Sequence, residues 1–368
     1  MESKSSSSFS ILNKLYDLGN KDLLNSIFEY INNEDLFGSL LCCNSKWKEL
    51  ISNPFYFRKR TIHISILSEL IQITKNYPYF THLYCQEVES KENSSFFISL
   101  FKQWKQVTFL GFYSPSLVSL QKIVEEIPFP KLREARLSVH HYSSNQTNKG
   151  FFYSTLNFTL WSKLEKLKLD GVPISSLKCF SSLKGSLKKL VLASVEVEDD
   201  DLFPLTNLLQ LENLAIVHSF IKLTKEPQVN YPSSKFPAYK LINLKRLELD
   251  CYCVYLFGCF MKPISEGEKE EEEEETSNYL QLETLQLRDW IIALNKHTPF
   301  WWKHKSFQKL SSLIILQPGL PPEFGSILVD PSPVIENFKK EIAQNIQELK
   351  SILESHFKNI DHLYVGQG

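Results

Sequence analysis

A short apolar pattern recurs ten times along the chain and constrains the fold more than any other feature. Each copy has an apolar residue, two variable residues, an apolar residue, one variable residue and a third apolar residue. The first five copies are Phe80/Leu83/Cys85, Trp104/Val107/Phe109, Leu132/Ala135/Leu137, Leu164/Leu167/Leu169 and Leu187/Leu190/Leu192. The other five are Leu211/Leu214/Ile216, Leu244/Leu247/Leu249, Leu282/Leu285/Leu287, Leu310/Leu313/Ile315 and Ile360/Leu363/Val365. Ten copies exceed what the abundance of leucine produces by chance.

The spacing of the copies identifies the kind of repeat. Successive copies start 23 to 50 residues apart, and the shortest spacings lie within the window of about 20–29 residues typical of leucine-rich repeats. Burying three aliphatic side chains contributes roughly 1.5–3 kcal/mol each. Ordering two dozen residues costs at least about 1 kcal/mol per residue. Because one repeat cannot fold alone, we predict a stack of repeats: an α/β leucine-rich-repeat solenoid over residues 61–368, with a parallel sheet and outer helices.

Two segments interrupt the array. Glu266–Glu275 contains eight glutamates and one lysine, a local charge of −7. We predict a disordered acidic loop at about residues 263–278, inserted between two repeats. The whole chain has a net charge of −1, so the rest of the chain carries +6. Ser332-Pro333 is a good helix start, and we predict a long amphipathic helix after it that seals the last repeat.

The turns after the strands depart from the usual leucine-rich-repeat pattern. These repeats often place Asn or Cys three residues after the last core position, where the side chain satisfies backbone groups of the turn. In this chain the equivalent positions hold Phe112, His140, Val172, Val195, Ser219, Tyr252, Trp290 and Pro318. We therefore predict an irregular solenoid.

Composition argues against several classes of protein. Only 12 of the 368 residues are glycine, and no glycine-rich phosphate loop, nucleophile elbow, zinc-helix motif or Cys-x-x-Cys is present. We expect no enzyme activity, cofactor, metal site, nucleic-acid partner or membrane span. Seven cysteines form no regular framework and no secretory leader is visible, so we expect reduced thiols and a cytoplasmic or nuclear location.

The first sixty residues differ from the array. Residues 1–15 are serine-rich, and we expect them to be a disordered tail. Over residues 16–60, three short helical patterns follow Asn20, Asn33 and Asn44, and a Pro at position 54 ends the third. We predict a small all-α head.

The head resembles an F-box. The resemblance lies in residues 23–31, which include Leu23-Leu24 and Ile27-Phe28, then in Glu34-Asp35-Leu36 and Leu40-Leu41-Cys42-Cys43. It continues through the block around Trp47 to Asn53-Pro54-Phe55-Tyr56-Phe57-Arg58. The Leu-Pro that opens the family pattern falls on Gly19-Asn20, a departure at the surface that meets the adaptor.

F-box proteins with leucine-rich repeats are substrate receptors of cullin–RING (SCF-type) ubiquitin ligases. The resemblance implies that the head docks on the ligase adaptor within the cullin complex while the repeats bind an unknown target protein. The adaptor-binding residues would be Leu23, Leu24, Ile27, Phe28, Ile31, Leu36 and Trp47. The alternative is a leucine-rich-repeat interaction scaffold without a link to ubiquitination, whose head only caps the first repeat.

Residues between the core positions of each strand point outward, and in the middle repeats many of them are basic. We predict that the target binds to a cluster on adjacent strands, which would hold an acidic or phosphorylated segment. Its members are Arg136, Lys166, Lys168, Lys189 and Arg246.

Overall fold

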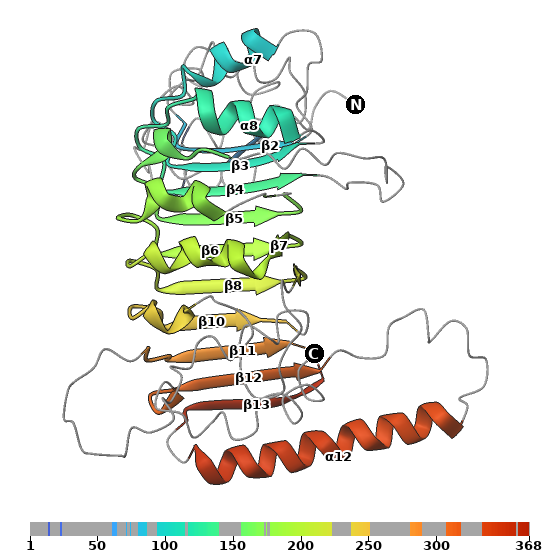
Figure 1. The fold of residues 1–368 in the computed structure, drawn as a ribbon. Coiled ribbons are helices and arrows are strands. Elements are labelled where there is room, and N and C mark those ends of the chain that lie inside the picture. Colours follow the sequence, from blue (N-terminus) through green and yellow to red (C-terminus); the bar gives the residue numbers. More distant parts are fainter. Residues whose placement is uncertain are drawn as a thin grey trace, which may run out of the picture. The chain divides into compact units, whose positions relative to one another are not determined.

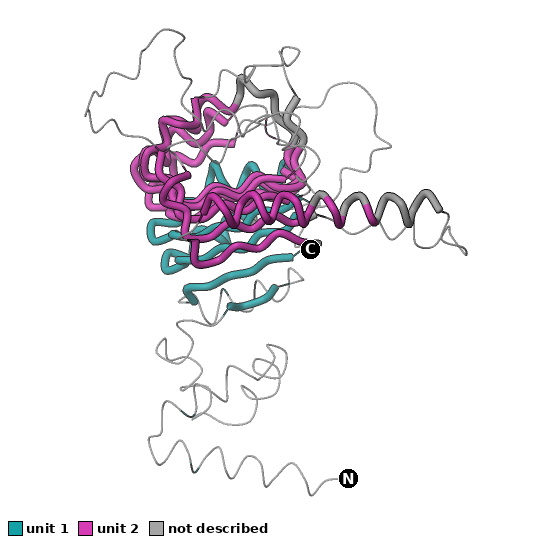
Figure 2. Tube along the Cα trace, turned by 90° about the horizontal axis from the view of Figure 1, so that it is seen from below, with its two compact units in different colours: residues 1–141 teal, residues 142–368 magenta. Residues whose placement is uncertain are grey.

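A computed structural model gives the fold of the chain as two compact units, Met1–His141 and Tyr142–Gly368 (Figure 2). The description below covers residues 14, 23, 61–64, 71, 74, 80–86, 94–114, 117–139, 156–172, 174, 177–222, 237–250, 280–288, 307–317, 333–357 and 360–367. The predicted tail apart from residue 14, the predicted head apart from residue 23, and the acidic segment at 263–278 lie outside these residues, so the tail, head and loop are not described.

Unit 1 is built on four parallel strands in sequential order, which are β1 (Thr61–Ile64), β2 (His82–Gln86), β3 (Phe109–Ser114) and β4 (Glu134–Val139). The described residues of unit 1 also include the helices α7 (Ser94–Phe101) and α8 (Leu117–Glu126). Helix α8 lies on one face of the strands, where it buries Leu120, Ile123 and Val124 (Figure 1). The other face of these strands is formed by the residues between the core positions.

Unit 2 contains a run of seven parallel strands in the order β5-β6-β8-β10-β11-β12-β13 (Figure 1). They are β5 (Lys166–Asp170), β6 (Lys189–Ala193), β8 (Asn213–Val217), β10 (Arg246–Leu249), β11 (Thr284–Arg288), β12 (Ser312–Gln317) and β13 (His362–Gln367). A separate parallel pair joins β7 (Glu196–Glu198) to β9 (Phe220–Lys222). Strands that follow each other through a repeat and pair in parallel are the arrangement of a leucine-rich-repeat solenoid, as the sequence predicts.

The recurring apolar positions form the core. In the repeat of β5, for example, Leu164, Leu167 and Leu169 are each at most 1% exposed. Each of the ten predicted copies coincides with a strand. Strand β1 is an eleventh strand of the sheet, and the repeated pattern does not include it. The sequence of β1 carries only two of the apolar positions, because only Ile62 and Ile64 of this strand are buried core residues.

One copy has a different register from the prediction. The strand pairing aligns Leu83 with Leu110 and Cys85 with Phe112, so the core positions of β3 are Val107, Leu110 and Phe112. The predicted set was shifted by three residues and wrongly placed Phe109 in the core. Both sets fit the same apolar spacing, and only the pairing with β2 distinguishes them. Phe112, which the sequence analysis placed at a turn position, is therefore a core residue of β3.

The same pair of backbone hydrogen bonds recurs where successive strands begin. Two consecutive N–H groups donate to a single carbonyl of the preceding repeat: those of Lys188 and Lys189, for example, donate to Glu165 O at 2.8 and 3.0 Å. The same arrangement recurs at the starts of β3, β4, β8, β10, β11, β12 and β13. It fixes the register of neighbouring strands, because each shared carbonyl accepts only from the equivalent pair of residues.

Within the described residues, the predicted outer helices of unit 2 before β10 are 3-10 helices. They are η2 (Thr159–Trp161), η3 (Leu177–Leu183), η4 (Asp199–Asn207) and η5 (Ala238–Lys240). Pro204 lies inside η4 and lacks the N–H group that an α-helix interior needs. A 3-10 helix rises about 2.0 Å per residue, so a short repeat crosses the unit with few residues. Asp199, Asp200 and Asp201 form the start of η4.

The turns after β5, β6 and β8 are regular. The residue after each strand, Gly171, Ser194 or His218, has a left-handed conformation with φ of 64°, 53° and 52°. The N–H of Gly171 donates to Ala193 O, and the N–H of Ser194 donates to Val217 O, at 2.9 and 3.0 Å. The predicted irregularity is therefore absent from these three turns.

Buried side chains replace the usual asparagines in the same turns. Val172, Val195 and Ser219 are at most 2% exposed. Ser219 Oγ accepts a hydrogen bond from the N–H of Val195 at 3.2 Å and lies 3.3 Å from Leu192 O. This serine therefore links neighbouring repeats, as the asparagine of other leucine-rich repeats does, while the two valines add apolar packing.

The predicted long helix is α12 (Pro333–His356), and it packs against β13 (Figure 1). Leu349 and Leu353 are its buried residues in the part whose side chains are described, which confirms that this part of the helix covers the last repeat. No helix within the described ranges is both long enough and apolar enough to cross a membrane.

Candidate functional site

Four of the five predicted target-binding residues meet on the outward face of the seven strands of unit 2, called here the unit 2 strand face. Alternation along each strand places the leucines in the core and the residues between them on this face. The strand pairing aligns these residues in rows across the sheet. The first row is Lys166, Lys189, Asn213, Arg246, Thr284, Ser312 and His362.

The second row changes character along the sheet. It consists of Lys168, Val191, Ala215, Glu248, Gln286, Ile314 and Tyr364. It starts with a lysine and two small apolar residues, continues with the polar residues Glu248 and Gln286, and ends with an apolar and an aromatic residue, with Tyr364 49% exposed. The second row therefore presents basic, apolar, polar and aromatic side chains on successive strands.

Lys166 and Lys189 form a pair of cationic residues on β5 and β6, the first two strands of this face. They are direct partners on β5 and β6, whose axes lie about 4.8 Å apart as in any sheet, and both are exposed. Like charges this close repel each other, and an anionic group placed between them relieves that repulsion. Lys168 lies beside them, and its Nζ is 2.9 Å from Asp170 Oδ2.

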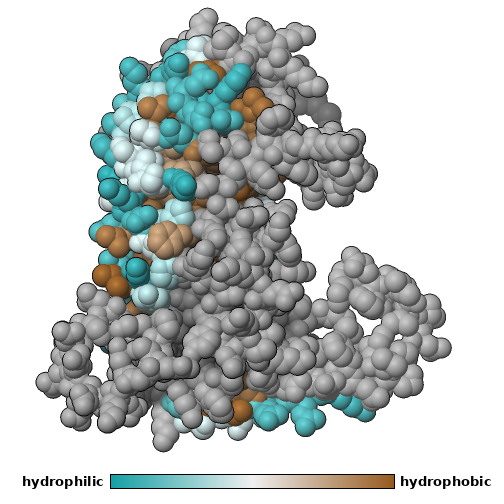
Figure 3. All heavy atoms as spheres, in the orientation of Figure 1, coloured by the Kyte–Doolittle hydropathy of each residue, from teal (hydrophilic) through white to brown (hydrophobic). Residues whose placement is uncertain are grey.

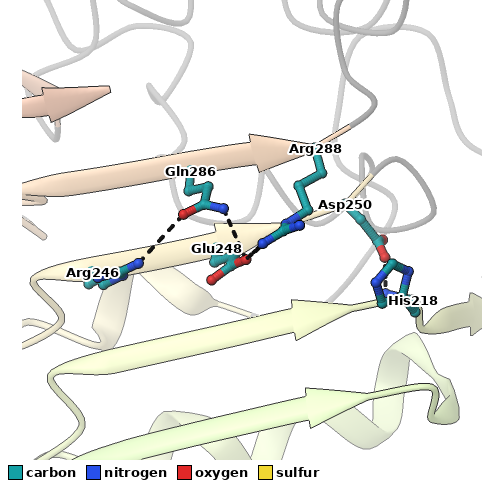
Figure 4. Close-up of polar contacts among 6 residues, drawn as sticks. All are labelled: His218, Arg246, Glu248, Asp250, Gln286 and Arg288. Carbon is teal, nitrogen blue, oxygen red and sulfur yellow. Dashed lines mark hydrogen bonds and ion pairs between the residues drawn. The ribbon is translucent and has the colours of Figure 1, made fainter. Parts of the chain in front are cut away.

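Arg246 belongs to a polar network at the centre of the face (Figure 4). Its guanidinium donates to Gln286 Oε1 at 3.5 Å, and Gln286 Nε2 donates to Glu248 Oε1 at 3.2 Å. The same carboxylate oxygen accepts from Arg288, which lies 2.8 Å away. Arg246 is therefore held toward β11, and Asn213 separates it from Lys189 in the row.

Sequence reasoning missed Arg288 and its ion pair with Glu248. The alternation along the strand could have indicated Arg288, because Arg288 lies two positions after Gln286 and so points to the same face of the sheet. The side chain of Glu248 is only 17% exposed, so this ion pair has a structural role in fixing the surface.

Arg136, the fifth predicted residue, lies on β4 of unit 1. Its guanidinium pairs with Glu134 at 2.9 Å and lies over the ring of Phe109, 5.3 Å from the ring centre. The structure thus brings four of the five predicted target-binding residues onto one face and places the fifth in the other unit.

The predicted adaptor-binding residues are mostly beyond the described part of the chain. Leu23 lies in a helix and its side chain is 43% exposed. The remaining ones, Leu24, Ile27, Phe28, Ile31, Leu36 and Trp47, fall outside the described residues.

Of the two described cysteines, Cys85 is buried and Cys179 is half-buried. Burial raises the pKa of the Cys179 thiol to about 12, and it raises the pKa of the Cys85 thiol still further. Neither is a reactive nucleophile, because the thiolate is the reactive form. Within the ranges that the structure describes, no three His, Cys, Asp or Glu residues are grouped so that they could hold a metal ion. Cys251, Cys253 and Cys259 lie outside these ranges.

Comparisons with known proteins add little to the fold. No protein-family model matches the chain. No curated protein matches it either. Among solved structures, the chain is similar to an internalin of Listeria monocytogenes, with 13% sequence identity and a TM-score of 0.36. The match covers 80% of this chain and 64% of the internalin chain, so the chain spans less than two thirds of that protein's length.

The fold assignment therefore rests on the strands themselves. Parallel strands that recur with the repeat, buried leucines on one face and turns of one conformation define a leucine-rich-repeat solenoid. Solenoids of this kind offer extended surfaces that bind proteins.

Proposed function

We propose that this chain is a substrate-recognition adaptor of a cullin–RING (SCF-type) ubiquitin ligase. The F-box-like head would dock on the ligase adaptor, and the strand faces of the repeats would bind the target protein. The chain itself would be a non-catalytic receptor subunit without a cofactor, acting in the cytoplasm or nucleus. It would accelerate ubiquitin transfer by raising the effective concentration of target lysines near the activated ubiquitin.

One observation carries the target-binding half of this proposal. Lys166 and Lys189 are exposed register partners on an ordered strand face, with Lys168 beside them. Such a cluster suits a carboxylate or phosphate of an extended segment. The ligase half rests on the resemblance of residues 23–58 to an F-box. A scaffold without a ligase remains the second candidate, and the Gly19-Asn20 departure favours it.

Co-purification with the ligase adaptor tests the ligase half. The full chain should retain the adaptor, and the double variant Leu23→Asp/Phe28→Asp should lose it, because aspartate removes the apolar contact. Leu209→Asp is the matched control, since Leu209 is an exposed leucine of unit 2 and should leave adaptor binding unchanged. Absence of the adaptor from the wild-type complex, or its retention by the double variant, would leave the scaffold as the function.

Charge reversal tests the target-binding half. The triple variant Lys166→Glu/Lys168→Glu/Lys189→Glu should lose the partners that the wild-type chain captures through acidic or phosphorylated segments. A second triple variant, Lys178→Glu/Lys184→Glu/Lys240→Glu, changes the same charge on exposed lysines of the outer layer and should retain them. An identical set of partners for the wild type and the first variant would overturn the anionic-segment assignment. Phosphatase treatment of the captured partners separates phosphate from carboxylate recognition.

A further inference from the structure

The outward face of unit 1, called here the unit 1 strand face, has a different chemistry from that of unit 2. Of the side chains that β1 to β4 present on it, five carry rings: His63, His82, Tyr84, Phe109 and Tyr113. The charged groups on these strands are Glu134 and Arg136, and they neutralise each other in an ion pair of 2.9 Å. This face is therefore neutral and aromatic.

A glycine makes room for the central ring. Gly111 on β3 is the register partner of Tyr84 on β2. A Cβ atom placed on Gly111 would lie 2.1 Å from Tyr84 Cδ2 and 2.8 Å from Cε2, so the tyrosine ring occupies the space of the missing side chain. The Tyr84 ring thus extends across the neighbouring strand, with the ring of His63 5.1 Å from it on the other side.

A second group of planar side chains lies beside the first. The rings of His82 and Phe109 stack with their centres 5.7 Å apart and their planes 21° from parallel. The guanidinium of Arg136 lies over the same phenylalanine ring, and both its Nε and one terminal nitrogen donate to Glu134 Oε1. These contacts hold the planar groups in place before any partner binds, which lowers the entropy lost on binding.

Composition and charge together select the kind of partner. Aromatic residues and arginine are enriched at the centres of protein interfaces, whereas lysine and glutamate are depleted there. Single-stranded nucleic acid also stacks on aromatic rings, but it requires a positively charged groove beside them. The neutral Arg136–Glu134 pair provides no such groove.

We infer that the unit 1 strand face binds a protein segment of low charge through proline or aromatic side chains that stack on Tyr84 and Phe109. This inference deepens the proposed function, on which it rests, by naming the chemistry of a target segment. It also distinguishes two faces, since the acidic or phosphorylated segment proposed above would bind unit 2. Gly111 makes room for the Tyr84 ring and so determines where that ring lies on the unit 1 strand face.

A selection of phage-displayed random 12-residue peptides on the full wild-type chain tests the inference. We expect enrichment of peptides with proline, tyrosine, tryptophan or phenylalanine. Synthetic copies of them should lose at least fivefold in affinity for the Gly111→Ala variant, because the added methyl group displaces the Tyr84 ring. Gly185→Ala is the matched control, since a Cβ at Gly185 meets nothing within 4 Å and should leave affinity unchanged.

A second variant covers the case in which Gly111→Ala does not fold. His63 is exposed, and His63→Ala removes a ring of the unit 1 strand face without filling the core, so peptide affinity should fall about threefold. Peptides that bind both variants as tightly as the wild type, or selected peptides that are acidic and lack rings, would overturn the inference. Binding of a 20-nucleotide oligouridine that is lost in Gly111→Ala would overturn it as well.

The readout is independent of the ligase. Peptide affinity is measured on the chain alone, whereas adaptor binding is measured by co-purification through the head. Loss of adaptor binding with retained peptide binding would contradict only the ligase role, and the reverse result would contradict only this inference.

Discussion

The backbone N–H of His218 donates a hydrogen bond to the Oδ2 atom of Asp250, which directly follows β10 (Figure 4). In the two preceding repeats the equivalent N–H groups, those of Gly171 and Ser194, donate to a backbone carbonyl of the next strand. Asp250 thus substitutes a side-chain oxygen for a main-chain one. The substitution continues the regular turn beyond the point where strand pairing with β10 ends.

We expect Asp250→Ala to destabilise the protein by about 1–3 kcal/mol, because it removes the carboxylate oxygen that accepts a hydrogen bond from the His218 N–H. Asp250 is 1% exposed, and its Oδ1 atom has no hydrogen-bond partner. Asp250→Asn retains an oxygen acceptor and should cost less than the alanine variant. Urea unfolding measures both free energies, and equal losses would show that the acceptor is not what matters.

Ser219→Ala should cost about 1–2 kcal/mol, because Ser219 Oγ accepts from the Val195 N–H and contacts the Leu192 carbonyl between repeats. Ser355→Ala is the control, since Ser355 is an exposed serine that bonds only within its own helix at Ile352 O. Its effect on the unfolding free energy should stay within about 0.5 kcal/mol. A loss for Ser219→Ala no larger than that of the control would mean that this link between repeats adds no stability.

Thr74→Val should cost about 1–3 kcal/mol, because the buried Trp104 indole N–H donates to Thr74 Oγ1 at 2.8 Å. Trp104→Phe removes that donor, at the additional cost of a cavity. Once Trp104→Phe has removed the donor, losing the threonine hydroxyl costs less, so the two single losses should sum to more than the loss in the double variant by about 1 kcal/mol. Strict additivity in thermal or urea unfolding would contradict the coupling.

Cys179 and Cys85 should resist alkylation by iodoacetamide in the folded chain at pH 8. With its pKa raised to about 12 by burial, Cys179 is a thiolate in only about one molecule in 10⁴ at that pH. Peptide mapping by mass spectrometry measures the rates in native buffer and in urea, where both thiols should react at the ordinary rate. Fast labelling in native buffer would contradict their burial.

The same shift links stability to pH. An ordinary thiol ionises near 9.0, so above that pH the unfolded chain releases a proton that the folded chain retains. The Cys179 contribution to stability is therefore complete below pH 9 and is lost as the pH rises toward 12. Cys179→Ser should show a shallower decline of unfolding free energy between pH 9 and 10.5 than the wild type. Parallel pH profiles would argue against the raised pKa.

The repeat pattern predicted the strands because the spacing of buried residues follows directly from the strand period and the repeat length. Leu164, Leu167 and Leu169 could be read as core from the sequence for this reason. The register at Trp104 could not, since two overlapping sets of apolar residues fit equally well. Pairing with β2 decides between them, and pairing joins residues 27 positions apart, such as Leu83 and Leu110.

The candidate surfaces were predictable only in part. Alternation placed Lys166, Lys189 and Arg246 on the outward face, but it could not show that Arg246 is held by Gln286. Nor could it show that Gly111 makes room for the Tyr84 ring, because both contacts cross between strands.

By itself, the sequence determined that the chain forms stacked repeats with leucines inside and polar residues outside, because periodic burial is a local property of each repeat. The tertiary structure alone decided the register of β3, the 3-10 outer layer, and which side chains meet across strands. These depend on interactions between residues about one repeat apart, for which the spacing of apolar residues carries no information. The His218–Asp250 hydrogen bond is of this kind, since it joins residues 32 positions apart.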